Sequence, residues 1–296
     1  MHDEHDLGLG HDLMALETRL LQRRRLLGLM GAGGGALLLN ACSGGGSDTS
    51  TTTSSTTTTT TTTTGGTGST GGTGNTGSSS CVALPNETNG PYPSDGSNTA
   101  NGVLSNSLIA TGIVRSDIRS SFGAMSGTAA GVPVTLTINL QNTNASCAAL
   151  ADYAIYLWHA DADGKYSIYD LPQQNYLRGV QATNSSGQAT FTTIFPGCYE
   201  GRYPHLHFEV FRSLATATAY ANRLLVSQFA MPAAACSAVY ATSGYPSSAS
   251  RFARTSITSD GIFGDNTSAQ QAAMTLAMSG SATAGYTASV TVGLAV

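Results

Sequence analysis

The chain has 296 residues, of which 41% are hydrophobic and only 10% are charged, and 35 of them are glycine. This composition is typical of an extracytoplasmic, β-rich protein rather than of a charged, helical cytosolic one. The formal net charge of −4 gives no reason to expect a nucleic-acid partner, because phosphate binding requires clustered Lys and Arg, and no such partner is expected.

Residues 1–42 are predicted to be a twin-arginine-type lipoprotein signal peptide that is removed from the mature protein. Three arginines at 23–25 precede the apolar stretch 26–40, which is short for a membrane span of about 20 residues and suits the hydrophobic part of a signal peptide. The sequence L-N-A-C at 39–42 resembles a bacterial lipobox, with Cys42 as the lipidated residue. The alternative is an ordinary secretory signal with an incidental cysteine.

Residues 43–80 consist almost entirely of Thr, Ser and Gly and include an unbroken run of threonines at 56–64. Because such a segment has nothing to bury, it is predicted to be a disordered tether. With a lipid on Cys42, the tether predicts an exported protein held at the cell envelope, on the periplasmic or cell-surface side. The lipid would be its only contact with the membrane.

The remaining residues, 81–296, have the length of one domain and the period-two pattern of β-strands. Strands are expected at 132–140, 153–159, 188–195, 205–211, 224–230 and 285–296. Turn signals such as DADG at 161–164 separate them, so the predicted fold is all-β: an antiparallel β-sandwich with long active-site loops. One helix of a turn or two is expected within 268–280.

Four cysteines lie in this domain, at positions 81, 147, 198 and 236. In an exported protein an even number of cysteines suggests two disulfides, and the sequence does not choose among the three pairings. The pairing we expect joins Cys81 to Cys147 and Cys198 to Cys236. A thiolate metal site is disfavoured, because no CxxC spacing occurs.

The stretch PHLHFEV at 204–210 contains two histidines one residue apart. Alternate residues of a strand point to the same face, so His205 and His207 project together while Leu206 points to the opposite face. This geometry suits a pair of metal ligands. The alternative is a pair of surface or core histidines, since HxH is also frequent outside metal sites.

Tyrosines close to these histidines in the sequence suggest a mixed ligand set. Tyr166 lies in the turn that follows the predicted strand 153–159, and Tyr199 and Tyr203 precede the two histidines. Phenolate oxygen combined with imidazole suits ferric iron better than zinc, which favours N and S, or calcium, which favours many carboxylates.

Three blocks of sequence resemble the intradiol ring-cleavage dioxygenases, the family of catechol 1,2-dioxygenase and protocatechuate 3,4-dioxygenase. They are NGPY at 89–92, LWHADADGKYS at 157–167, and the segment 176–210 that ends in PHLHFEV. The blocks occur in the family's order and span most of the chain after Cys81. The resemblance implies a β-sandwich domain over 81–296 that binds non-haem Fe(III).

The resemblance also implies the roles of individual residues. Tyr166, Tyr199, His205 and His207 would be the iron ligands. Tyr199 would also act as a base when the substrate displaces it, and Arg202 would stabilise negative charge on the bound ring. The implied reaction cleaves a catechol between its two hydroxylated carbons with O2 and yields a muconate-type diacid.

The chain departs from the best-known members of the family in two ways. The gap between Tyr199 and His205 is shorter than in the cytoplasmic enzymes and resembles that of an exported bacterial branch, and Tyr203 is close enough to be an alternative phenolate. No helical N-terminal dimerisation segment is present in the sequence, so the family's oligomeric state does not carry over.

The other candidate residues are expected to have mainly structural roles. Trp158, Tyr153 and Tyr156 are interpreted as packing residues of a sheet, and Asp161 and Asp163 as turn residues rather than calcium ligands. His159 would either support the site or solvate a strand end. Arg178 would either line the mouth of the site or form a structural salt bridge.

Two alternative functions stay open at the level of sequence. The first is a non-catalytic, exported β-sandwich binding module of the same descent that retains the histidines for structure. The second is a zinc or copper site on the HxH pair without dioxygen chemistry.

Overall fold

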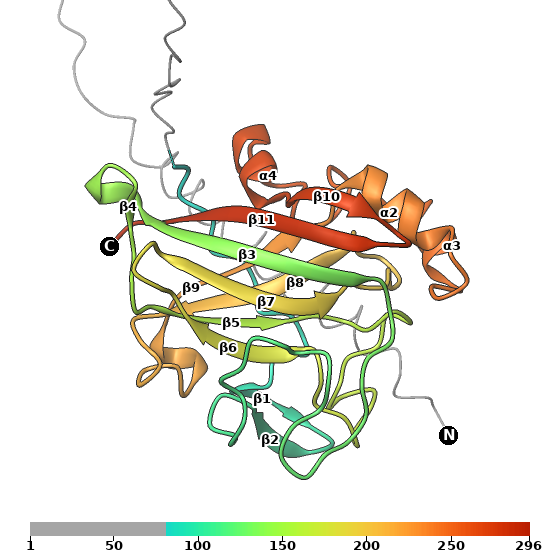
Figure 1. Cartoon of the computed structure of the whole chain (residues 1–296), viewed down its shortest axis with the longest axis horizontal. Coiled ribbons are helices and arrows are strands. Elements are labelled where there is room, and N and C mark those ends of the chain that lie inside the picture. The colour runs from blue at the N-terminus through green and yellow to red at the C-terminus, as the bar shows by residue number, and fades with distance from the viewer. Residues whose placement is uncertain (1–80) are drawn as a thin grey trace, which may run out of the picture. The chain divides into compact units, whose positions relative to one another are not determined.

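The structure, a computed structural model, describes residues 81–296; the predicted signal peptide (1–42) and tether (43–80) lie outside the described residues. The described part is mostly β-structure with a few short helices, which confirms the predicted fold class (Figure 1). Its strands are β1 (Asp95–Ala100), β2 (Val103–Asn106), β3 (Pro133–Asn142), β4 (Ala148–Ala149), β5 (Ala154–Trp158), β6 (Arg178–Ala182), β7 (Gln188–Ile194), β8 (His205–Phe211), β9 (Arg223–Ala230), β10 (Ala277–Ser281) and β11 (Gly285–Leu294). Its helices are α2 (Ala233–Tyr240), α3 (Ser248–Phe252) and α4 (Ser268–Met274), with short 3-10 turns at Thr143–Ala145 and Tyr220–Asn222.

Two sheets pack against each other as a sandwich. One sheet has the strand order β10-β11-β3-β4, with β7 also paired to β3, and the other has the order β6-β5-β8-β9. The apolar alternation of the strands places one face of each sheet in a shared core, which includes Leu136 and Ile138 of β3, Phe191 of β7 and Phe208 of β8. This core holds the two layers together.

One strand pair differs from the expected antiparallel arrangement. Strand β11 pairs with β3 in parallel, from Tyr286 opposite Val134 to Leu294 opposite Asn142. A short hairpin forces neighbouring strands to be antiparallel, but more than a hundred residues separate these two strands and leave their relative direction free. The turn signals of the sequence therefore could not have predicted this pair.

Several elements were missed by the sequence analysis. The sequence analysis did not expect strands β1, β2, β4, β6 and β10 or helices α2 and α3. Helix α4 falls within the segment where one helix was predicted. Helix α4 begins at a capping box, in which Thr267 accepts from the backbone N–H of Gln270 and the Gln270 side chain accepts from that of Thr267. Among residues 81–296, no helix is long and apolar enough to cross a bilayer.

The predicted disulfide pairing is half right. Cys81 is bonded to Cys147, as expected, but Cys198 and Cys236 are free, buried thiols. The Cys198 thiol lies 3.6 Å from the carbonyl oxygen of Arg202, and Cys236 lies on the buried face of α2. Sequence spacing does not reveal such burial, and the expected second disulfide was therefore wrong.

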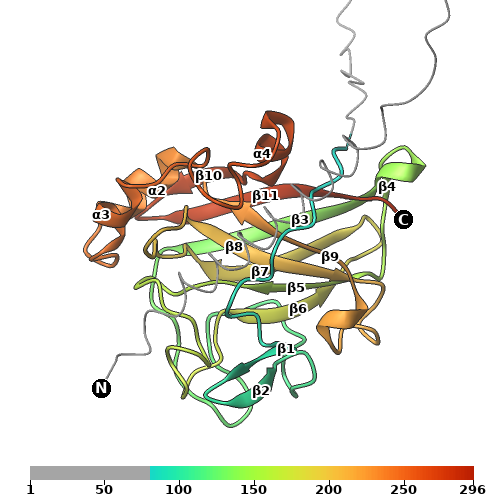
Figure 2. The ribbon, with the colours of Figure 1, turned by 180° about the vertical axis from the view of Figure 1, so that it is seen from behind.

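The outer face of the β6-β5-β8-β9 sheet is also buried. A second apolar cluster covers it, including Tyr156 and Trp158 of β5 and Val180 of β6. The β1–β2 hairpin and the loops around it lie below this sheet in Figure 1 and, seen from behind, again beside β5 and β6 in Figure 2. The HxH strand is thus buried on both faces.

Candidate metal centre

Strand β8 carries two histidines on the outer face of its sheet. His205 and His207 are each 2% exposed, and their Nε2 atoms lie 3.0 Å apart. Leu206, between them, belongs to the core shared by the two sheets, as the alternation of the strand requires. The predicted common orientation of the two histidines is confirmed.

Two tyrosines reach the same point from separate loops. The Tyr199 hydroxyl, from the loop before β8, lies 3.1 Å from Nε2 of His205. The Tyr166 hydroxyl, from the loop after β5, lies 3.2 Å from Nε2 of His207. Two phenol oxygens and two imidazole nitrogens therefore form a continuous chain of four neighbouring donor atoms.

The surroundings keep both imidazoles neutral. His205 donates its Nδ1 proton to the carbonyl oxygen of Tyr203 at 2.6 Å, which leaves the lone pair on Nε2, and His207 stacks on Trp158 with ring centroids 5.0 Å apart. Burial and the nearby charge of Arg202 lower the pKa of His205 to about 3. Burial, followed by the neighbouring His205, lowers the pKa of His207 well below its usual value. Neutral imidazole is the form that binds metals.

The donor set fits a metal ion that accepts phenolate oxygen. In residues 81–296, no cluster of three or more His, Cys, Asp or Glu could hold an ion, so a site here requires the two phenols. Adjacent donor atoms that share one ion at about 2.1 Å lie about 3 Å apart, close to the spacing of these four atoms. The mixture of hard phenolate oxygen and imidazole suits ferric iron better than zinc.

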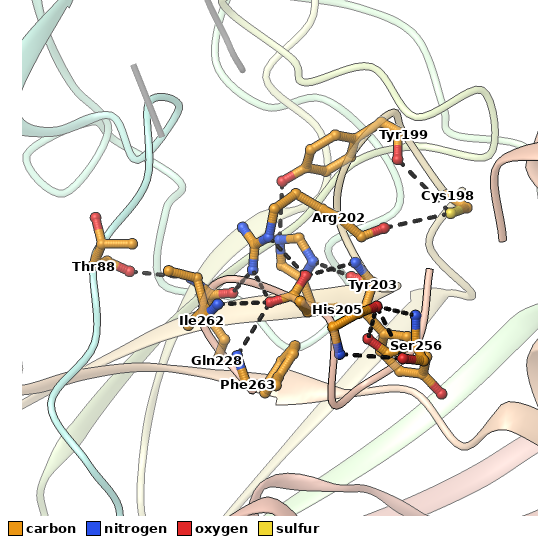
Figure 3. Close-up of polar contacts among 12 residues, drawn as sticks. Thr88, Cys198, Tyr199, Arg202, Tyr203, His205, Gln228, Ser256, Ile262 and Phe263 are labelled. Atoms are coloured by element: carbon orange, nitrogen blue, oxygen red, sulfur yellow. Dashed lines mark hydrogen bonds and ion pairs between the residues drawn. The ribbon is translucent and has the colours of Figure 1, made fainter. Parts of the chain in front are cut away.

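An arginine is held beside these donors by two buried acceptors. Arg202 donates from Nε to Asp260 Oδ2 at 2.9 Å and from Nη2 to Gln228 Oε1 at 2.7 Å. Figure 3 shows its side chain among Tyr199, His205 and Gln228. The Arg202 side chain is 4% exposed and that of Asp260 0%. The guanidinium therefore has a fixed position next to the donor set.

The NGPY segment covers one side of the donor set. A Cβ on Gly90, whose φ is +71°, would lie 3.0 Å from Cε1 of His207, so both the backbone conformation and the space favour glycine there. The ring of Tyr92 lies 4.7 Å from that of Tyr166, centroid to centroid. This segment therefore packs against the His207 and Tyr166 side of the site.

Tyr203 points away from the donor atoms. Its ring packs against Phe252 and Phe263, at centroid distances of 5.8 and 6.3 Å, and it belongs to the core between the sheets. Burial raises the pKa of Tyr203 above its usual value. The geometry therefore brings Tyr199 rather than Tyr203 to His205.

The remaining candidates have structural roles. His159 is buried and lies 2.6 Å from the Thr193 hydroxyl of β7, and Asp161 accepts from the backbone N–H groups of Asp163 and Lys165, as a turn residue does. Neither expectation for Arg178 is met, because this residue is buried. It donates to the carbonyl oxygens of Tyr92, Pro93 and Ser167 and to the hydroxyls of Ser167 and Tyr156.

Sequence reasoning missed two residues of this site, Gln228 and Asp260. Gln228 is a polar residue within the apolar strand β9 and lies opposite His207 in the strand register. A polar residue in that strand was a usable signal once the pairing of β8 with β9 was known. Asp260 lies in a loop 58 residues after Arg202, and no local pattern distinguishes it.

Residues 115–223 match the family model described as "Dioxygenase", and this segment contains all five residues for which a site role was predicted. No curated protein matches the chain. Among solved structures, an intradiol ring-cleavage dioxygenase from Tetranychus urticae is 23% identical, with a TM-score of 0.55, and the match covers 73% of this chain and 95% of that one.

Two bacterial structures are also similar. The dioxygenase domain of a dioxygenase–carbohydrate-binding fusion from Streptomyces sp. SirexAA-E is 20% identical (TM-score 0.44, covering 73% of this chain and 99% of that one). The 3-chlorocatechol 1,2-dioxygenase of Rhodococcus opacus 1CP is 17% identical (TM-score 0.41, covering 70% of each chain). The fold is inferred from the Tetranychus structure, whose TM-score exceeds 0.5. Residues 115–223 are therefore similar to the dioxygenase family model, and the described domain has the fold of the intradiol ring-cleavage dioxygenase from Tetranychus urticae.

Proposed function

We propose that this protein is a non-haem Fe(III) dioxygenase that cleaves a catechol between its two hydroxylated carbons with O2, giving a muconate-type diacid. The observation that carries the proposal is the meeting of four donor atoms, from Tyr166, Tyr199, His205 and His207, at spacings of 3.0 to 3.2 Å. The match of residues 115–223 to the dioxygenase family model supports it independently.

In this proposal the four side chains hold the metal, and the protein presents them in the correct protonation state. His205 is fixed as the Nδ1–H tautomer by the Tyr203 carbonyl, so its Nε2 lone pair points to the other donors. When bound, ferric iron would supply Lewis acidity and a coordination position for the two oxygens of a catechol. The two phenols suit the ferric rather than the ferrous state.

Tyr199 is the ligand best placed to move a proton. It is half-buried and lies in the loop before β8, whereas Tyr166 is 1% exposed. A phenolate that leaves the donor set can take the proton of a substrate hydroxyl. We therefore assign the role of base to Tyr199, whereas Tyr166 would remain a metal ligand throughout the reaction.

Arg202 presents its guanidinium N–H groups near the ring of the substrate. Its guanidinium stands beside His205 and is held there from two directions, so it needs no rearrangement when negative charge develops on the catecholate. Because the site is buried, that interaction is stronger than it would be in water.

The test is spectroscopic and chemical. The purified protein, loaded with iron, is expected to bind one ferric ion, to show the visible charge-transfer colour of tyrosinate bound to Fe(III), and to consume O2 with one of catechol, protocatechuate, hydroxyquinol or larger diols. A ring-opened diacid identified by mass spectrometry would establish intradiol cleavage. A colourless protein that retains zinc or copper, or an iron-loaded protein that binds catechols without consuming O2, would contradict the proposal.

We also propose that the enzyme acts outside the cytoplasm, anchored by a lipid on Cys42. The Cys81–Cys147 disulfide supports this location, because disulfides persist in oxidising compartments. Membrane fractionation of the wild type and of Cys42→Ser tests it. Equal release of the two proteins into the soluble fraction would exclude the lipid anchor.

A further inference from the structure

Asp260 forms a buried ion pair with the arginine beside the donor set. Its carboxylate accepts from Arg202 Nε at 2.9 Å and Nη2 at 3.3 Å, and both side chains are almost completely buried. Asp260 is itself fixed by the backbone N–H groups of Ile262 and Phe263, at 2.9 and 3.1 Å. The loop that carries Asp260 therefore holds the Arg202 side chain in a fixed position.

The same carboxylate is also connected to His205 by a series of hydrogen bonds through the Tyr203 backbone. Asp260 Oδ2 also accepts from the backbone N–H of Tyr203 at 2.7 Å, and the Tyr203 carbonyl accepts the Nδ1 proton of His205 at 2.6 Å. Figure 3 shows these contacts converging from Arg202, Tyr203, Ile262 and Phe263. One buried carboxylate thus orders both the guanidinium and the peptide that orients a donor.

Asp260 also determines the charge of this part of the site. Burial alone would raise the pKa of Asp260, but Arg202 and the Tyr203 N–H outweigh burial and hold that pKa below its usual value. The carboxylate is therefore ionised and neutralises Arg202. The other buried arginine close by, Arg178, already donates all five of its N–H groups to protein acceptors.

We propose that Asp260 is a positioning and specificity-determining residue, which holds Arg202 in place and neutralises it so that the site selects catechols without a carboxylate substituent. This inference rests on the proposed dioxygenase function. A carboxylate on the substrate ring would be buried in a site that offers it no uncompensated cation. Burial of an unpaired charge is strongly unfavourable. An uncharged catechol carries no such penalty.

The decisive measurement is the ratio of kcat/KM for catechol to kcat/KM for protocatechuate, its carboxylated analogue, in the iron-loaded full chain. In Asp260→Asn the charge of Arg202 is no longer compensated, so this ratio is expected to fall by about tenfold or more. Asp163→Asn is the matched control, because it removes one acidic charge at an exposed turn, and its ratio should equal that of the wild type. An unchanged ratio in Asp260→Asn overturns the inference.

Two further variants test whether Asp260 affects this ratio through the charge of Arg202. In Asp260→Asn combined with Arg202→Gln, the released cation is absent, and the ratio should return towards that of the wild type. Gln228→Glu places a second carboxylate on Arg202 Nη2, so the ratio should rise, and this variant decides the question if Asp260→Asn does not fold. A ratio that stays low in the double variant, or that does not rise in Gln228→Glu, contradicts the inference.

A metal-free measurement separates this inference from the proposed function. In iron-free protein the Nε–H of Arg202 should exchange slowly with solvent in the wild type and at least about tenfold faster in Asp260→Asn, because the hydrogen bond to Oδ2 weakens. Equal exchange rates reject the positioning role. If exchange changes as expected but no iron colour or O2 uptake appears, the proposed function fails while the positioning role stands.

Discussion

The two faces of strand β8 are equally buried but chemically opposite. Leu206, Phe208 and Val210 pack into the core between the sheets, whereas His205, His207 and Glu209 point to the outer face, which loops and the β1–β2 hairpin cover. The inner face stabilises the sandwich by burial of apolar surface. The outer face buries polar side chains, two of which belong to the proposed donor set. Burial alone therefore does not separate structural from functional residues in this protein.

The largest expected effect comes from removal of a donor on the outer face. His207→Ala should lower iron affinity by more than about 100-fold and abolish the visible colour, because loss of a ligand exceeds the 10- to 100-fold typical of residues that only support one. Iron content after gel filtration and the visible spectrum are the measurements. His159→Gln serves as the control, since His159 lies outside the donor set. Full iron content in His207→Ala would refute the assignment of the outer face.

On the inner face the expected effect is on stability. Phe208 stacks on Phe229 at a centroid distance of 4.1 Å and an interplanar angle of 7°, and both are fully buried. Phe208→Ala should lower the free energy of unfolding by about 3–5 kcal/mol through lost burial and the cavity left behind. Denaturant unfolding measures this loss. The fraction of variant that stays folded should still bind iron, and loss of the metal from folded Phe208→Ala would mean that the two faces are not independent.

His159, on the inner side, allows the comparison to be tested through the pH dependence of the free energy of unfolding. Burial lowers the pKa of His159 to about 4, whereas the unfolded chain takes up the proton near the usual value of 6.5. Its contribution to stability is therefore complete above pH 6.5 and is lost as the pH falls towards 4, by about 3 kcal/mol in total. The difference in free energy of unfolding between wild type and His159→Gln, followed from pH 7.5 to 4, should shrink by this amount. A difference that does not depend on pH would contradict the burial of a neutral imidazole.

The smallest effect is expected at Tyr203, whose ring packs in the core between the sheets. Tyr203→Phe should change the free energy of unfolding by no more than about 1 kcal/mol and leave the visible colour intact, because the ring packs in the core and only its hydroxyl is lost. Tyr199→Phe, on the outer side, should shift or remove the colour. Visible spectra of the two variants decide between them. The reverse result would make Tyr203 the phenolate ligand.

The sequence by itself predicted the β-sandwich, six of its strands and the common orientation of His205 and His207. These features depend on residues that are close in the chain, where period-two alternation and turn residues act locally. The four proposed ligands and Arg202 were named from the resemblance to a family, whose motifs are local as well. The Cys81–Cys147 pair was preferred but not determined by spacing.

Only the tertiary structure decided which tyrosine reaches His205, that Cys198 and Cys236 are free, and that β11 runs parallel to β3. It also revealed Asp260 and Gln228 on Arg202, at separations of 58 and 26 residues. The physical reason is the same in each case. These contacts join residues far apart in the chain, and their energies depend on burial and on the direction of side chains, which exist only after the sheets have packed.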